Sequence, residues 1–390
     1  MAQRIPFSTA YLYLTLMLAL LLAGNAQATS ALIPAPPQVS ARSYLVMDTD
    51  TGHIIAADRE SERFAPASLT KMMTSYIVEY EISKGNISEE DLVLISEKAW
   101  RTGGSRMFIQ EGTQVKVGDL LRGVIIQSGN DASVALAEHI AGSERAFADL
   151  MNQHARLLGM ENTHFVNATG LPADDHYSSA IDLAKLAKAL ITRFPEHYAI
   201  YSQKYFTYNN IRQPNRNKLL WRDNSVDGIK TGHTDDAGYC LVASAKRDDM
   251  RLITVVMGTD SEEARARESQ KLLSYGFRYY RTHQLYTAGA VLKDSKIWAG
   301  ARDQIRLGLT EDLAVTVPRG KADQLEANIE LDKVIKAPVA QGQELGKVRV
   351  SIDGETVATV PLVALEAVAE GGLFKRIWHA IVLFFLGLIG

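Results

Sequence analysis

The sequence Gly228-Ile229-Lys230-Thr231-Gly232-His233-Thr234 begins the part of the chain where a β pattern returns after a long helical region. We predict strands at Ile229–Thr231, Tyr239–Ala245 and Leu252–Met257, because these apolar and β-branched runs are separated by charged or glycine-containing turns. A helical pattern follows from Ser261 to Tyr280. This part of the chain therefore contains several strands and then one helix.

The sequence before this segment completes the pattern. Tyr44–Asp48 and His53–Ala57 flank the turn sequence Asp50-Thr51-Gly52, which predicts a β-hairpin. Helical patterns dominate between this hairpin and residue 228. They are expected at Leu69–Ser83, Ala132–Ala141, Glu144–Leu158 and Ser179–Thr192. Strands first, helices in the middle, and strands with a helix last predict an α+β domain, residues 41–285, with one antiparallel sheet built from both ends.

The sequence changes character from about Thr287. Short β-like runs occur at Ala314–Pro318, Ile329–Lys336, Lys347–Ile352 and Thr356–Val360, with glycine turns between them. We predict a small β-rich second domain over residues 286–370, and no residue cluster in it indicates chemistry.

Composition excludes several classes of protein. The 390 residues carry a net charge of 42 − 45 = −3 and are 46% hydrophobic, which fits a globular protein with more than one domain. There is no long basic run, so no nucleic-acid partner is expected. Cys240 is the only cysteine, and its β-like context favours a buried structural residue over a nucleophile. The nine histidines show no metal-binding spacing, so neither a metal nor another cofactor is expected.

The N-terminus has the three parts of a secretory signal peptide. Arg4 precedes the apolar run Tyr11–Ala23, and Ala26-Gln27-Ala28 has the small-x-small pattern of a cleavage site. We predict a signal peptide over residues 1–28 and a proline-rich, extended lead-in over residues 29–40. The alternative is an uncleaved anchor, but the 13-residue run is shorter than the ~20 residues that span a bilayer.

The C-terminal residues 371–390 predict an amphipathic membrane anchor. Only 14 residues follow Arg376, which as a helix reach about 21 Å, less than a bilayer core of about 30 Å. Lys375, Arg376 and Trp378 suit the headgroup level, and the apolar residues after them can enter the acyl chains. The alternative is a terminal helix that packs on the protein's own core.

Three short motifs indicate acyl-transfer chemistry. In Pro66-Ala67-Ser68-Leu69-Thr70-Lys71, a helix that opens at Ser68 places the Lys71 amine one turn away, where it can activate the hydroxyl as a base. Ser128-Gly129-Asn130 places a second hydroxyl and an amide on a turn that leads into a helix. Lys230-Thr231-Gly232 supplies a charge, a hydroxyl and a close backbone approach on a strand. Each motif alone fits ordinary surface structure, but all three in this order do not.

The ordered motifs form the signature of penicillin-recognising serine enzymes. With their flanking segments, such as Gln127–Ala132, Asn162–Phe165 and Asp227–Thr234, they make the chain resemble the low-molecular-weight penicillin-binding protein 5 type of D-alanyl-D-alanine carboxypeptidase. The resemblance runs through the mature chain, including the β-rich domain and the anchor. It implies a protein exported to the periplasmic face of the bacterial inner membrane, peptidoglycan stem peptides as substrates, and β-lactams as covalent inhibitors.

The resemblance also implies roles for individual residues. Ser68 would attack the carbonyl between the two terminal D-alanines, Lys71 would be the general base, and Ser128 would pass the proton to the leaving amine. The other implied substrate contacts are Asn130, Lys230, Thr231, Gly232, His233 and Arg216. The backbone N–H groups of Ser68 and His233 would form the oxyanion hole. Arg212 and Arg222 are alternatives to Arg216 for binding the terminal carboxylate.

Three other functions remain open at this point. A class A β-lactamase shares the motifs, but no Glu-x-x-Leu-Asn sequence lies between Ser128 and Lys230 to activate water for deacylation. A D,D-endopeptidase of peptidoglycan cross-links uses the same motifs. A non-catalytic wall-binding scaffold is disfavoured because all motif residues are intact.

Overall fold

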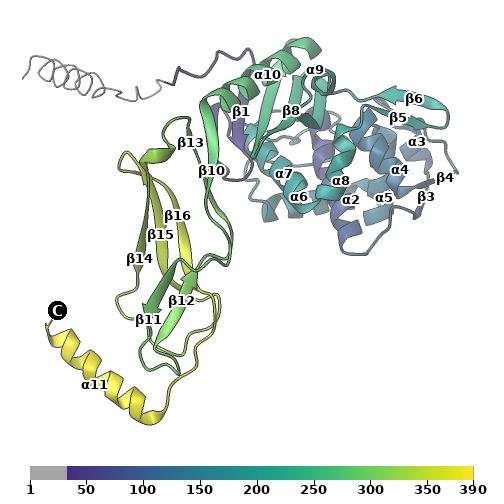
Figure 1. Ribbon diagram of the computed structural model, residues 1–390. Helices are drawn as coiled ribbons and strands as arrows, with labels where there is room; N and C mark the ends of the chain where they lie inside the picture. The colour runs from purple at the N-terminus through teal and green to yellow at the C-terminus, as the bar shows by residue number, and fades with distance from the viewer. Residues whose placement is uncertain (1–32, 390) are drawn as a thin grey trace, which may run out of the picture. The chain divides into compact units, whose positions relative to one another are not determined.

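The computed structural model describes residues 33–389 (Figure 1). The predicted signal peptide lies outside these residues, as do the first residues of the predicted lead-in. The helices and strands up to residue 279 surround one central sheet. Its strands, in spatial order, are β2 (Ile54–Asp58), β1 (Ser43–Asp48), β9 (Met250–Thr259), β8 (Gly238–Arg247) and β7 (Val226–Thr234).

The central sheet joins the two ends of the larger domain, as the sequence predicts. Every neighbouring pair of strands is antiparallel, and β1 pairs with β9, more than 200 residues later in the chain. The hairpin predicted around Asp50-Thr51-Gly52 is present as β1 and β2. The α+β fold class is therefore confirmed, and the lysine-bearing strand β7 lies at one edge of the sheet.

Helices pack on both faces of this sheet (Figure 1). Helix α10 covers one face, and α7 packs against β9 and β1 from the helical cluster on the other. The helices are α2 (Lys71–Ser83), α3 (Glu97–Arg101), α4 (Val117–Arg122), α5 (Asn130–Ala141), α6 (Glu144–Leu157), α7 (Ala180–Arg193), α8 (Pro195–Tyr198), α9 (Leu219–Arg222) and α10 (Glu262–Tyr279). Two short two-stranded antiparallel sheets accompany them, β3 (Leu92–Leu94) with β4 (Gln114–Lys116), and β5 (Tyr205–Tyr208) with β6 (Ile211–Pro214).

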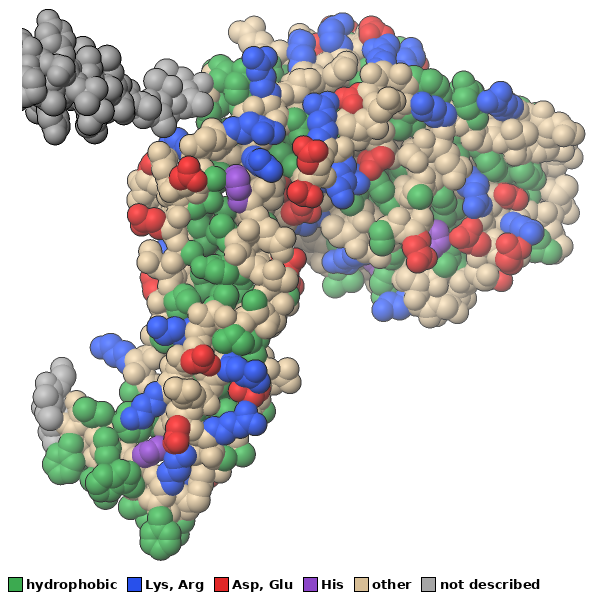
Figure 2. Space-filling view, in the orientation of Figure 1, with side chains coloured by type: hydrophobic (Ala, Val, Ile, Leu, Met, Phe, Trp, Pro, Cys, Tyr) green, Lys and Arg blue, Asp and Glu red, His purple; other side chains and the backbone are tan. Residues whose placement is uncertain are grey.

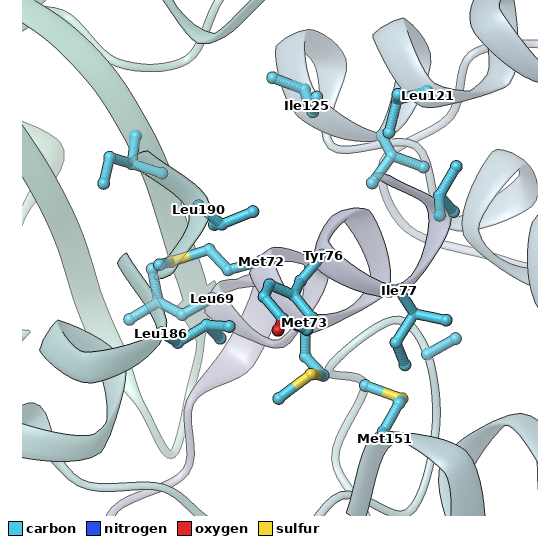
Figure 3. Packing of buried hydrophobic residues seen from close by; sticks show 14 of the residues in the cluster. Leu69, Met72, Met73, Tyr76, Ile77, Leu121, Ile125, Met151, Leu186 and Leu190 are labelled. Carbon is cyan, nitrogen blue, oxygen red and sulfur yellow. The ribbon is translucent and has the colours of Figure 1, made fainter. Parts of the chain in front are cut away.

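Helix α2 lies in the centre of the hydrophobic core (Figure 3). Met72, Met73 and Ile77 on this helix are fully buried. They are surrounded by side chains from α4, α6 and α7, such as Leu121, Met151 and Leu186. Since every residue of the helix from Lys71 to Glu79 is buried, packing rather than capping fixes its position, and the residues at its N-terminus are held rigidly.

The start of this helix differs from the prediction. The sequence predicts a helix that opens at Ser68, but Ala67–Thr70 forms a 3-10 turn, η1, and the α-helix begins at Lys71. No side chain caps the helix at Thr70. The tighter turn continues directly into α2, so the prediction was wrong by one turn, although Ser68 and Lys71 remain three residues apart on the same side.

The chain from Tyr280 onward forms a second group of strands with its own core. β10 (Tyr280–Tyr286) pairs with β13 (Leu313–Pro318). The other strands form a sheet in the order β11 (Lys293–Lys296), β12 (Gln304–Gly308), β16 (Glu355–Ala364), β15 (Glu344–Ile352) and β14 (Leu325–Leu331). Ile305, Val348 and Leu362 belong to a hydrophobic cluster separate from that around α2. These strands agree with the small β domain that the sequence predicts after the larger α+β domain.

The C-terminal segment is the helix α11 (Leu373–Ile389). Its first turns contact the strand domain, where His379 Nδ1 accepts a hydrogen bond from the Ala299 N–H at 2.8 Å, and Lys375 pairs with Asp303. Apolar side chains are nevertheless exposed along it, as Figure 2 shows by the green side chains at this end of the chain. Phe374 is 89% exposed and Trp378 is 64% exposed. No helix among residues 33–389 is long and apolar enough to cross a membrane.

Candidate active site

Ser68 lies on a turn that is fixed from two sides. Ala67, just before it, is buried and has a positive φ of 47°, which an alanine adopts only where its surroundings hold it. Gly170 packs so closely against this turn that an added Cβ would lie 1.8 Å from the Ala67 carbonyl oxygen. On another side, a Cβ on Gly232 of β7 would be 3.0 Å from the Pro66 carbonyl oxygen. The turn that carries Ser68 therefore packs between the loop that contains Gly170 and the edge strand β7.

Lys71 contacts the Ser68 hydroxyl from a fully buried position. Its Nζ lies 3.0 Å from Ser68 Oγ and donates a second hydrogen bond to the Thr169 carbonyl oxygen at 2.6 Å. Burial, with the charge of Arg216 adding to it, lowers the pKa of Lys71 to about 7, while Asp131 opposes the shift. A substantial fraction of this amine is therefore neutral near neutral pH, as a general base requires.

Ser128 forms a second serine–lysine pair. It ends the π-helical turn η2 (Gly123–Gln127) with a positive φ of 66°, so its side chain leaves the turn in a fixed direction. Lys230 Nζ, from β7, donates to Ser128 Oγ at 2.9 Å and to its neighbour Thr231 O at 3.0 Å. Burial lowers the pKa of Lys230 well below its usual value, and the charges of Lys71 and Arg216 act in the same direction.

Asn130 binds a neighbouring loop rather than lining the cavity. Its Nδ2 donates to the Gly103 carbonyl oxygen at 2.6 Å, and its backbone N–H donates to Ser105 O at 2.7 Å. Asp131 accepts hydrogen bonds from the N–H groups of Met107 and Phe108. The turn after Ser128 thus holds the loop that brings Ser105 to the site.

One cavity of about 180 Å³ brings most of the predicted residues together. It is lined by Ser68, Ser105, Ser128, Arg216, Thr231, Gly232, His233, Tyr239, Glu262 and Arg265. Lys71 and Lys230 lie behind the two serines and reach the cavity through their hydrogen bonds to them. Of the nine residues predicted, Asn130 is the one that neither lines the cavity nor contacts a hydroxyl that does.

Among the three candidate arginines, Arg216 is the one that lines the cavity. Its Nε donates to the Gln127 carbonyl oxygen at 3.1 Å, next to Ser128. Arg212 lies over the Tyr205 ring, 4.0 Å from its centroid, and Arg222 makes a bidentate ion pair with Glu263. The geometry therefore favours Arg216 as the binder of an anionic substrate group.

Sequence reasoning did not find four of the residues that line this cavity. Arg265 on α10 is 5% exposed and donates to the Gly232 carbonyl oxygen at 3.1 Å. The ring of Tyr239 on β8 stacks on His233 with centroids 4.0 Å apart. Ser105 and Glu262 complete the set. A buried arginine between Ala264 and Ala266, on the sheet-facing side of a predicted helix, was the signal available in the sequence.

Cys240 takes no part in this site. It is fully buried in β8, and burial raises the pKa of its thiol to about 11. Its Sγ lies 3.5 Å from Ala237 O and 3.9 Å from Gly238 O, and it belongs to the hydrophobic core of the domain. The predicted structural role is confirmed.

The arrangement is that of a serine acyl-transfer enzyme. One hydroxyl lies against a buried amine of lowered pKa, a second serine–lysine pair lies beside it, and Arg216 and Arg265 supply positive charge on the same cavity. Such a site suits attack on a carbonyl group next to a carboxylate.

Comparison with known proteins identifies the family. The family model of D-alanyl-D-alanine carboxypeptidases matches residues 30–261, and that of the penicillin-binding protein 5 C-terminal domain matches residues 280–370. The D-alanyl-D-alanine carboxypeptidase DacA of Escherichia coli is 46% identical over 363 residues, which cover 91% of this chain and 90% of DacA. The chain belongs to the D-alanyl-D-alanine carboxypeptidase family, as its resemblance to the penicillin-binding protein 5 type implies.

Solved structures agree with this assignment. Penicillin-binding protein 5 from Haemophilus influenzae matches with a TM-score of 0.83 at 45% identity, covering 86% of this chain and 100% of that one. Penicillin-binding protein D2 from Listeria monocytogenes in its ampicillin-bound form matches with a TM-score of 0.58 at 29% identity, covering 62% of this chain and 100% of that one. The fold class and the enzyme class expected from the sequence are both confirmed.

Proposed function

We propose that Ser68 is the nucleophile that removes the terminal D-alanine from peptidoglycan pentapeptide stems. The observation that carries this proposal is the Ser68–Lys71 contact of 3.0 Å, made by a lysine whose pKa is lowered to about 7. Neutral Lys71 takes the hydroxyl proton while Ser68 Oγ forms a bond to the carbonyl carbon. The negative charge that develops on the carbonyl oxygen faces the N–H groups of Ser68 and His233 in this proposal.

The second serine–lysine pair suits the departure of D-alanine. Breaking the C–N bond requires a proton on the leaving amine. Ser128, held by its hydrogen bond from Lys230 Nζ, delivers its hydroxyl proton and takes in return the proton that Lys71 removed from Ser68. The carboxylate of the leaving D-alanine would lie against Thr231, Arg216 and Arg265, which line the same cavity. Water then attacks the ester carbon while neutral Lys71 takes one of its protons. The bond between Ser68 Oγ and the carbon breaks as that proton passes to Oγ, and the shortened peptide leaves with a new carboxyl terminus.

Penicillin should acylate the same serine and stay bound. The segment from residue 158 to residue 179 brings only the Thr169 carbonyl to Lys71, and its carboxylates, Glu161, Asp174 and Asp175, are exposed. The chain thus offers no carboxylate there to activate a hydrolytic water, which disfavours the β-lactamase alternative.

The test is intact mass after incubation with penicillin, together with D-alanine release from a pentapeptide, for the wild type and for Ser68→Ala. We expect a penicilloyl adduct and D-alanine release in the wild type and neither in the variant. An adduct without D-alanine release would instead favour a D,D-endopeptidase. A folded wild type that forms no adduct would contradict the proposal and favour a wall-binding scaffold.

We also propose that the protein works outside the cytoplasm, on the periplasmic face of the bacterial inner membrane, with α11 lying in the membrane surface. The signal-peptide pattern and the exposed Phe374, Trp378 and Phe384 on α11 support this. Co-sedimentation with anionic vesicles should be lost when Phe374 and Trp378 are both changed to Ser. Substitution of the exposed Leu157 on α6 by Ser is the matched control and should leave sedimentation unchanged. Equal sedimentation of all three proteins would contradict the anchor.

A further inference from the structure

The loop over residues 163–178 supplies the second hydrogen-bond partner of Lys71. It connects α6 with α7 and carries Thr169, whose carbonyl oxygen lies 2.6 Å from Lys71 Nζ. Asn167 Oδ1 accepts hydrogen bonds from the N–H groups of Thr169 and Gly170, which fixes the local shape of the loop. The orientation of Lys71 therefore depends on where this loop lies relative to α2.

His176 connects the two arms of this loop with the turn that carries the nucleophile. Its Nδ1 accepts a hydrogen bond from the Val166 N–H at 3.1 Å, and its Nε2 lies 2.8 Å from Thr70 Oγ1. Since a backbone N–H can only donate, Nδ1 is the acceptor and Nε2 carries the proton. The ring is buried and so is Thr70. Thr70 lies between Ser68 and Lys71 in the sequence, so this bond reaches the reactive turn itself.

The imidazole stays neutral over the range in which the enzyme is expected to work. Burial lowers the pKa of His176 to about 4, with His164 and Lys71 adding to the shift. A neutral ring can keep both hydrogen bonds, whereas a protonated ring would lose the one from Val166. Its own titration is thus well separated from that of Lys71.

We propose that His176 is a positioning residue for Lys71: by donating to Thr70 Oγ1, it fastens the 163–178 loop to the serine-bearing turn and so sets the place of the Thr169 carbonyl. The inference rests on the proposed role of Lys71 as the base. A second tie, from Thr74 Oγ1 to the Ala168 carbonyl oxygen at 2.7 Å, holds the same loop against α2. Loss of the hydrogen bond between His176 and Thr70 therefore makes the loop more mobile but leaves it attached to α2 through Thr74.

Loosening the loop has a predictable effect on the amine. The carbonyl contact favours the charged form of Lys71, so weakening it lowers the pKa of the amine. It also lets Nζ turn away from Ser68 Oγ, which slows acylation. The other charged groups that face Lys71 are Arg216, Asp131 and Lys230, and none of them lies on this loop.

The experiment measures the penicillin acylation rate from pH 5 to 9 for the full chain and four variants. His176→Gln keeps a donor that reaches Thr70, and Thr70→Ser keeps the acceptor. His176→Asn and Thr70→Val each remove the bond. We expect the two conservative variants to stay within about threefold of the wild type. The two disruptive variants should lose about tenfold in maximal rate, and the pH of half-maximal rate should fall by about half a unit.

A double variant and a stability control complete the design. His176→Asn combined with Thr70→Val should cost no more than either change alone, because both remove the same bond. Gly354→Ala strains an exposed turn between β15 and β16, outside the domain that carries the loop, and should change neither rate nor profile. Disruptive variants with an unmoved profile, or with a rate no lower than that of the conservative variants, would overturn the inference. Absence of any adduct in the wild type would instead overturn the proposed function and this inference with it.

Discussion

The two serine–lysine pairs of the site use the same contact for different purposes. Ser68 and Lys71 are three residues apart on one turn, whereas Ser128 and Lys230 are 102 residues apart and meet only in the folded chain. Both amines are buried, and both have lowered pKa values. The second partner of Lys71 is a carbonyl on a separate loop, whereas that of Lys230 is the carbonyl of its own neighbour Thr231. The comparison separates a base whose second partner can move with another loop from a lysine whose second partner lies on its own strand.

The largest effect should come from replacing Lys71 by arginine, compared with the same replacement at Lys230 in a separate variant. An arginine side chain keeps its positive charge but cannot give up its proton, so Lys71→Arg should lower the acylation rate by about 10²- to 10⁴-fold. Lys230→Arg keeps a side-chain donor for Ser128 Oγ and should cost less than about tenfold. Rapid-quench intact mass with penicillin measures both rates, and thermal unfolding checks that both variants fold. Equal losses at the two positions would remove the distinction between Lys71 as the base and Lys230 as a hydrogen-bond donor.

The next effect concerns the hydroxyl that meets the leaving group. Ser128→Ala should slow D-alanine release by about 10²-fold, because the leaving amine loses its proton donor. Adduct formation on Ser68 should remain detectable. Ser43→Ala is the matched control, since Ser43 is an equally buried hydroxyl on β1 that bonds only to the Arg59 carbonyl. A Ser128 variant as fast as this control would show that the second pair does not move a proton.

A smaller effect on activity but a clear one on stability is expected at Gly170. Its φ of +79° and the 1.8 Å approach of an added Cβ to the Ala67 oxygen predict that Gly170→Ala costs about 2–4 kcal/mol in unfolding free energy. Gly142→Ala has a similar φ of +75° but open space, and should cost only about 1 kcal/mol. Urea denaturation compares the two. Equal costs would mean that the loop does not press on the serine turn as closely as described.

The smallest effect is expected at Cys240. The thiol is buried and its pKa is raised to about 11, so a water-soluble maleimide should not label the native protein. Cys240→Ala should leave the acylation rate within about twofold of the wild type. Rapid labelling of the native chain, or loss of acylation in the variant, would contradict the structural role of Cys240 and indicate a functional one.

The sequence predicted the local parts of this site better than the parts made by tertiary contacts. Ser68 and Lys71 were visible because one turn brings them together, and the order of strands and helices was enough for the α+β class. Arg265 and Tyr239 were not visible, because α10 and β8 bring them to the cavity from segments without any motif. The 3-10 turn at Ser68 was also missed, since packing against Gly170 and Gly232 rather than local propensity fixes it.

The second domain shows a similar limit. The strand predicted at Ile329–Lys336 is present as β14, Leu325–Leu331, and thus begins earlier. Leu325–Leu331 alternates apolar and polar residues and none of them is buried, so the alternation predicts a strand here without fixing where it begins and ends. Pairing with β15, from Leu325 opposite Ile352 to Leu331 opposite Gly346, sets its limits.

The pH dependence of penicillin acylation in the wild type tests the central claim most directly. If Lys71 must be neutral to take the proton of Ser68, the rate should rise with pH and reach half its maximum near pH 7, the value to which the lysine pKa is lowered. The rise should be absent from the residual activity of Lys71→Arg. A wild-type rate that is constant from pH 5 to 9, or the same rise in Lys71→Arg, would contradict the assignment of Lys71 as the base.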